Sequence, residues 1–206
     1  MTLSDESAVR RVSDATRKPG QATNRTVAIS PVLEAWVTKL EFRTSMRDGE
    51  LYMSDPPTEL RFRVAEQAGN FSLSTSWRGA AWRPVMHADR IYYLEAAMVH
   101  ALFPGLRLDM NLPRLVIPRQ WNMAAVGFVP QLLEDGGTTL LHNGSPMPFR
   151  MYGREIIGPV SRYSYFLGSS VPELIAAVES PDGGIVASRV AERESISERD
   201  NPPSRR

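Results

Sequence analysis

The sequence contains no cysteine, and only two of its 24 basic residues, Lys18 and Lys39, are lysines. The absence of cysteine excludes a disulfide framework, a thiolate zinc site and a cysteine nucleophile. It also agrees with a reducing compartment. No run approaches the roughly 20 apolar residues that a membrane helix requires, and the N-terminus lacks the apolar core of a secretory signal. We therefore expect a cytoplasmic protein that does not enter a membrane.

Excess charge of one sign is also lacking, because 24 basic residues face 23 acidic ones and the formal net charge is +1. A dedicated nucleic-acid binder needs a concentrated basic surface, so we expect no nucleic-acid partner. Residues 1–28 and 188–206 hold few bulky apolar side chains and are predicted to be disordered tails. A single domain at residues 29–187 remains between them.

Residues 88–103 show the strongest helical pattern in the chain. Apolar residues recur every three or four positions, as on the buried side of an amphipathic helix, and the pattern predicts that Ile91, Met98 and Leu102 lie in the core. Pro104-Gly105 is predicted to end this helix. Four polar side chains are expected on its narrow solvent face: Asp89, Arg90, Glu95 and His100.

The segments on both sides of this helix alternate between apolar and polar residues, as half-buried strands do. Asp48-Gly49 predicts a hairpin turn within residues 42–54, and two further strands are expected at 60–66 and 71–77. A short helix is predicted to begin at Ser30-Pro31. The fold class is therefore α+β, with an antiparallel meander of about four strands and helices packed across it.

The second half of the sequence is less regular. Residues 127–134 and 138–141 are predicted to pair through a turn at 135–137, and 147–152 suggests one more short strand. Two helical pieces are expected at about 159–167 and 171–179, the latter with a proline and a glutamate in its first turn.

No group of side chains in the sequence has the spacing of a catalytic or metal site. His87, His100 and His142 stand far apart, and Glu134-Asp135 beside two glycines is most simply a solvated turn. There is no nucleophile-elbow pattern and no phosphate-binding loop. We expect no catalytic residue, no metal and no cofactor.

Basic residues are the remaining candidates for a binding site. Arg61 and Arg63 share one face of a predicted strand, and Arg43 and Arg47 lie on a predicted neighbour. They form either a basic patch that binds a partner or the ordinary solvent side of a one-sided sheet. Lys39 lies near the end of the first helix, where a cation also interacts favourably with the helix dipole.

Several short motifs resemble one family of immunity proteins from polymorphic toxin systems. The clearest are SRYSYFL at 161–167, VPEL at 171–174 and SPDG at 180–183. Four other segments are also similar to the family, namely SPVLEAW at 30–36, DGELY at 48–52, RIYYL at 90–94 and LPRL at 112–115. In this order they resemble immunity protein family sixty-one, which includes the immunity factor of the tuberculosis necrotizing toxin, an NAD-glycohydrolase.

The resemblance implies a binding protein that has no enzymatic activity. Such a protein blocks a cognate secreted toxin in a one-to-one complex in the cytoplasm of the producer, and an NAD-glycohydrolase is one such toxin. A chaperone or adaptor for a secreted effector is the alternative from another class. A third alternative is an enzyme with a site built from arginine, aspartate and tyrosine.

Overall fold

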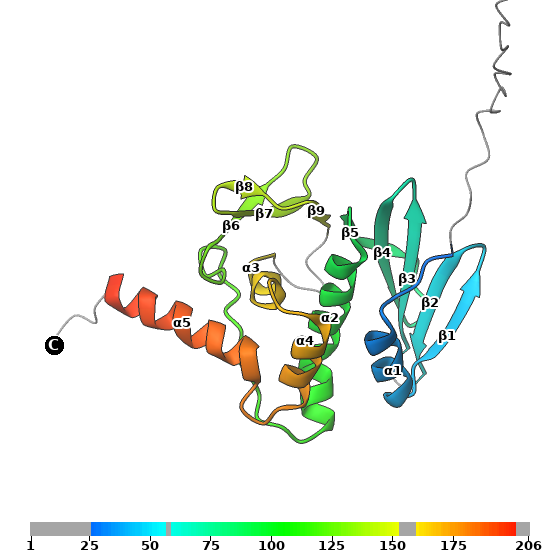
Figure 1. Cartoon of the computed structure of the whole chain (residues 1–206), viewed down its shortest axis with the longest axis horizontal. Coiled ribbons are helices and arrows are strands. Elements are labelled where there is room, and N and C mark those ends of the chain that lie inside the picture. Colours follow the sequence, from blue (N-terminus) through cyan, green and yellow to red (C-terminus); the bar gives the residue numbers. More distant parts are fainter. Residues whose placement is uncertain (1–25, 57–58, 153–159, 201–206) are drawn as a thin grey trace, which may run out of the picture.

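The computed structural model describes residues 26–56, 59–152 and 160–200 (Figure 1). The first half contains helix α1 (Pro31–Lys39), strands β1 (Arg43–Arg47), β2 (Glu50–Asp55), β3 (Leu60–Gln67), β4 (Asn70–Trp77) and β5 (Arg83–Ala88), and helix α2 (Ile91–Asp109). The second half contains strands β6 (Phe128–Leu132), β7 (Thr138–His142), β8 (Ser145–Pro146) and β9 (Phe149–Met151), helix α3 (Val160–Tyr163), the 3₁₀ helix η1 (Ser164–Phe166), and helices α4 (Val171–Glu179) and α5 (Gly184–Asp200).

Strands β1 to β5 form an antiparallel meander, which confirms the predicted fold class. The first hairpin turns at Asp48 and Gly49, whose φ angles of 54° and 82° suit the tight turn that Asp-Gly favours. Alternate residues of β2 and β3 point to opposite faces, and Met53, Phe62 and Val64 are fully buried on one of them. We call this the inner face and the other the outer face of the meander.

The second half of the chain extends the same sheet beyond β5. Strand β9 pairs with β5, β7 with β9, and β6 with β7, so the order is β1-β2-β3-β4-β5-β9-β7-β6, with β8 paired to β7. The predicted pairing of residues 127–134 with 138–141 is confirmed. Strand β5, which contains Pro84, was not predicted. It lies between β4 and β9.

The helices stack in layers beside the inner face of the meander (Figure 1). Helices α1 and α2 lie next to the strands, and α4 packs against both of them. Apolar side chains from all these elements form one core, which also includes Ile117 from the extended segment after α2. The α2 helix therefore separates the meander from α3, α4 and α5.

The α2 helix differs from its sequence prediction in length and in exposure. It continues through Pro104 to Asp109, because packing of Phe103 and Leu106 in the core outweighs the backbone hydrogen bond that proline removes. Glu95 and His100 do not face solvent but are each 3% exposed. The predicted burial of Met98 and Leu102 is confirmed, whereas Ile91 is only partly buried.

Two buried charged residues of α2 bind the ends of other helices. The carboxylate of Glu95 accepts a hydrogen bond from the backbone N–H of Ser30, the N-cap residue of α1. The guanidinium of Arg107 donates to the carbonyls of Pro113, Ala177, Val178, Ser180 and Pro181, at 2.5–3.3 Å. Both contacts place a charge where it complements a helix dipole.

The C-terminal segment differs from the disorder expected at residues 188–206. Helix α5 continues to Asp200, Val186 and Val190 are buried in the core, and Arg189 donates to Tyr165 O and Ser169 Oγ, both at 2.8 Å. The anchoring residues Val186, Arg189 and Val190 are few and lie about one helical turn apart. In a segment that is mostly charged, so few residues do not produce a clear amphipathic pattern. Of the expected tail at 1–28, residues 1–25 lie outside the described residues, while Val27 is buried.

The first prediction tests the packing of α2. Met98→Ala removes a fully buried side chain and should lower the free energy of unfolding by about 2–5 kcal/mol. Leu108→Ala in the same helix is the matched control, because Leu108 is 76% exposed and its loss should cost less than about 0.5 kcal/mol. Urea denaturation followed by circular dichroism measures both values. Equal midpoints for the two variants would contradict the packing of α2.

The second prediction concerns α5. A chain that ends after residue 187 loses the buried Val190 and the two hydrogen bonds of Arg189. Its Tm in differential scanning calorimetry should fall by more than about 5 °C, since a loss of a few kcal/mol shifts Tm by several degrees in a chain of this size. A Tm equal to that of the full chain would show that α5 adds nothing to the core.

Candidate partner-binding surface

The four arginines that are candidates for a basic patch all lie on the outer face of the meander. The strand register places Arg43 opposite Ser54, which in turn lies opposite Arg61. In the next row of the same face, Tyr52 lies opposite Arg63. Arg47 lies in a third row, opposite Glu50. Because side chains alternate across a sheet, the four arginines share one face.

Two of these arginines interact with aromatic side chains. The Arg63 guanidinium lies 5.3 Å from the ring centre of Trp82, and that of Arg47 lies 5.7 Å from the ring of Tyr52. Trp82 contacts Tyr52 edge-on at 5.8 Å between ring centres. These cation–π contacts hold the arginines against the sheet at distances typical of the interaction. The sequence pattern indicated the arginines but not Trp82. Trp82 follows a turn and lies outside the predicted strands, so the alternation of residues could not assign it to a face of the sheet.

A carboxylate neutralises part of the patch. Glu50 accepts a 2.6 Å hydrogen bond from the Tyr52 hydroxyl and lies 4.0 Å from Arg63 Nε. The hydrogen bond to Glu50, followed by burial, raises the pKa of the Tyr52 phenol. Tyr52 therefore remains a neutral donor at physiological pH. Arg43 and Arg61 are exposed and have no such partner among the described residues.

Lys39 does not belong to this surface. It ends α1 on the inner side of the meander, and its ammonium lies 3.2 Å from Glu179 Oε1 at the end of α4. The side chain is 70% exposed, so this ion pair contributes little stability. The structure thus brings four of the five candidate residues together and leaves Lys39 apart.

The three histidines do not form a site. His87 and His142 are both exposed. His87 contacts Tyr152 edge-on, with ring centres 5.2 Å apart, and His142 stacks on Phe128, with ring centres 4.8 Å apart. His100 is buried against Phe166, and burial, together with the nearby Arg162, lowers its pKa to about 3. An imidazole with this pKa is neutral near pH 7 and cannot act as a general acid there.

Metal binding and membrane insertion have no support in the described ranges. Within residues 26–56, 59–152 and 160–200, no three histidine, aspartate or glutamate side chains gather where they could hold a metal ion. The helices in this part of the chain also lack the length and apolar character needed to span a membrane.

Six of the seven residues of the motif at 161–167 are buried in the core, and Arg162 is partly exposed. Tyr163, Tyr165 and Phe166 have no exposed area, and Ser164 Oγ accepts a 2.7 Å hydrogen bond from Ala125 N. The Tyr163 hydroxyl donates to Tyr93 O at 2.7 Å. Burial raises the pKa of both tyrosines, that of Tyr165 to about 12. These buried residues therefore specify the fold, and partner contacts must come from exposed or partly exposed positions.

Comparisons with known proteins found a family model and a solved structure that are similar to this chain. The family model described as immunity protein 61 matches residues 35–184. A solved structure described as Rv3902c from M. tuberculosis superimposes with a TM-score of 0.60 at 16% sequence identity, over 75% of this chain and 91% of that chain. At this identity the structural match shows a shared fold. No curated protein matches the chain.

The third prediction follows from His100. Its pKa is depressed in the folded protein, to about 3, against 6.5 for an unperturbed histidine. Protonation of the unfolded chain therefore removes stability as the pH falls below 6.5, by about 2 kcal/mol between pH 7 and pH 5. Chemical denaturation at each pH measures this loss.

The variant His100→Gln should lose most of this pH dependence, because glutamine does not titrate. His142→Gln is the control and should retain it, since His142 is exposed. The same slope in His100→Gln as in the wild type would assign the pH dependence to other groups.

Proposed function

The chain belongs to the immunity protein 61 family, and on this premise we propose that it is an immunity protein that binds and blocks a cognate protein toxin. The observation that carries the proposal is the match of the family model to residues 35–184, which include the meander, α2 and α4. A role as an inhibitor needs a stable binding surface and no catalytic group. The scattered histidines and the buried, neutral His100 agree with such a role.

We further propose that the toxin is an NAD-glycohydrolase and that the complex forms one-to-one in the cytoplasm of the producer. The support for the chemistry is the resemblance of the sequence to the family that includes the immunity factor of an NAD-glycohydrolase toxin. Blocking such an enzyme requires that the inhibitor cover its substrate cleft. An interface of the usual size buries about 800 Å² on each partner.

The outer face of the meander is our first proposed contact surface. Arg43 and Arg61 are exposed and lie in one row across β1 to β3, next to the aromatic pair Tyr52–Trp82. Arginine and aromatic side chains are the residue types that most often contribute strongly to binding. Lys39 is a separate candidate on the other side of the sheet, where a toxin would have to displace its contact with Glu179.

Co-expression tests the function. We expect a gene for a toxin domain immediately upstream of the gene for this chain. Bacteria that express that domain should stop growing and lose NAD, and co-expression of the full chain should restore both. Loss of NAD without the chain identifies the toxin's chemistry. If the chain fails to restore growth although both proteins are present in soluble form, the proposed function is wrong. A toxin that arrests growth at normal NAD would overturn only the NAD-glycohydrolase part.

The fourth prediction tests the outer face. The double variant Arg43→Gln/Arg61→Gln should weaken binding of the purified toxin domain by at least about tenfold in a calorimetric titration, since hydrogen bonds to charged groups are strong. Its Tm should stay close to that of the wild type, because both side chains are exposed. Lys39→Glu is measured in parallel. Wild-type affinity in either variant would remove the residues concerned from the interface.

A further inference from the structure

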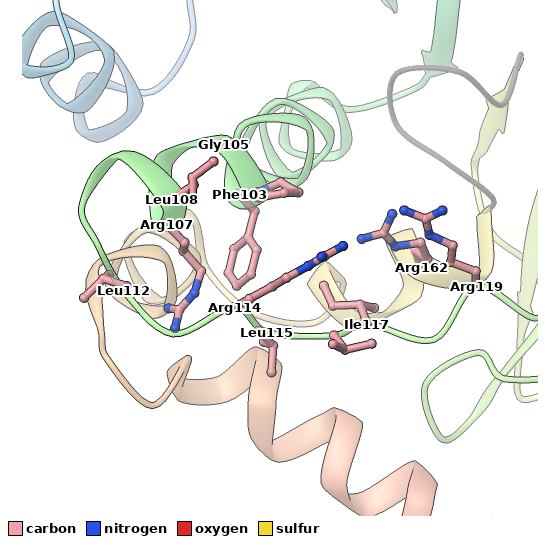
Figure 2. Close-up of a pocket in the computed structure, with 12 residues that line it drawn as sticks. Phe103, Gly105, Arg107, Leu108, Leu112, Arg114, Leu115, Ile117, Arg119 and Arg162 are labelled. Atoms are coloured by element: carbon pink, nitrogen blue, oxygen red, sulfur yellow. The ribbon is translucent and has the colours of Figure 1, made fainter.

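A second cationic site lies on the other side of α2 from the outer face of the meander. It is a cavity of about 580 Å³ between the C-terminal half of α2, the extended segment at residues 112–119, and α3 (Figure 2). Phe103, Leu112 and Leu115 form its apolar wall. None of the functional candidates discussed above lines this cavity.

Three arginines converge at one end of the cavity. The guanidinium groups of Arg114, Arg119 and Arg162 point toward one another from the extended segment and from α3 (Figure 2). In the part of the chain that the structure describes, no carboxylate pairs with any of them. Arg162 Nε is shielded from solvent and has no acceptor among the described residues. Burial, followed by the charges of Arg119 and Arg114, lowers the pKa of Arg162.

Arginines in other partly buried positions have partners. Arg107 donates to five backbone carbonyls, and Arg189 donates to Tyr165 O and Ser169 Oγ. The exposed Arg150 also has a partner, since its Nη1 lies 2.7 Å from Asp135 Oδ2. Arg162 is partly buried, and its charge lies beside those of the exposed Arg114 and Arg119. Like charges held close together repel one another, whereas an anion bound between them would remove this repulsion. The three arginines therefore have the arrangement of an anion-binding site without its anion.

The rim of the cavity is apolar and exposed. Leu108 and Val116 line the cavity and are 76% and 70% exposed. These are the two highest exposed fractions among the large hydrophobic side chains in the described residues. Exposed aliphatic groups beside a cavity indicate contact with another macromolecule more than with a small ion. A phosphate ion would occupy only the arginine end and would leave both side chains in water.

We propose that this cavity binds an acidic segment of a partner protein, with a carboxylate between the three arginines and an apolar side chain against Leu108 and Val116. The guanidinium fork suits a carboxylate because it forms two parallel hydrogen bonds. Identification of the partner as the toxin rests on the proposed function. The site itself rests on the charge and the shape of the cavity.

A peptide titration is the fifth prediction, and it does not require the toxin. A fluorescein-labelled peptide of alternating leucine and glutamate should bind the full-length wild-type chain in a fluorescence anisotropy titration. The same peptide with glutamine in place of glutamate should bind at least about tenfold more weakly, because it lacks the charge-assisted hydrogen bonds. Equal binding of both peptides, or no binding of the acidic peptide, would overturn the proposal.

Two sets of variants locate the site. Arg114→Gln/Arg119→Gln should lose at least about tenfold in affinity for the acidic peptide, and Leu108→Ser should also weaken it. Arg78→Gln/Arg90→Gln removes the same charge at two exposed positions outside both proposed sites and should bind like the wild type. Wild-type affinity in Arg114→Gln/Arg119→Gln would overturn the site. Competition by inorganic phosphate together with no effect of Leu108→Ser would show a small-anion site and overturn the protein partner.

The toxin domain is then titrated into the same variants. Weaker binding to Arg114→Gln/Arg119→Gln than to the wild type identifies the toxin as the partner. Unchanged toxin affinity in this variant overturns that identification while the proposed function stands. If the wild-type chain does not bind the toxin at all, the proposed function fails, and the peptide titration alone decides whether the cavity binds an acidic segment.

Discussion

The buried guanidinium of Arg107 is the interaction on which the helical side of the structure depends. Arg107 is only 3% exposed, so burial removes most of the hydrogen bonds that its guanidinium would make with water. The five carbonyl acceptors replace these hydrogen bonds. These carbonyls belong to the end of α4, the turn after it, and Pro113. A single side chain therefore fixes α2, α4 and the start of the 112–119 segment to one another. The same residue lines the cavity, so it also holds in position the segment that carries Arg114 and Arg119.

Glu95 has the complementary role twelve residues earlier in α2. Its carboxylate meets the N-terminus of α1, where backbone N–H groups lack acceptors, and Arg107 meets the C-terminus of α4, where carbonyls lack donors. Each charged group thus supplies hydrogen bonds that water would otherwise make with these helix ends. Exchanging either side chain for an apolar one would remove a charge but leave a buried helix end without partners, which is the larger cost. The central helix is consequently apolar in composition and depends on two charges.

The sequence was sufficient to predict the first four strands of the meander but not these contacts. Strand periodicity and the Asp48-Gly49 turn are local signals, and they placed β1 to β4 and one face for the arginines correctly. Apart from the carbonyl of Pro113, the partners of the buried Glu95 and Arg107 are 65 to 74 residues away, and no local pattern contains them. The continuation of α2 through Pro104 and the docking of α5 have the same cause. In both cases tertiary packing outweighs a local signal that points the other way.

The arginines show why binding sites are harder to predict than the fold. Because lysine is nearly absent, arginine fills structural and surface positions alike, and the sequence cannot distinguish them. The structure separates three environments: backbone carbonyls around Arg107, aromatic rings beside Arg47 and Arg63, and the cavity of Arg162. The first two environments supply partners from within the described chain, and the third does not. A group whose partner is not supplied by the fold is the group that a second molecule can stabilise.

The family motif at 161–167 places Arg162 in that position while its neighbours Ser161 and Tyr163 are buried in the core. The residues that specify the fold therefore also hold the side chain that is left available for binding.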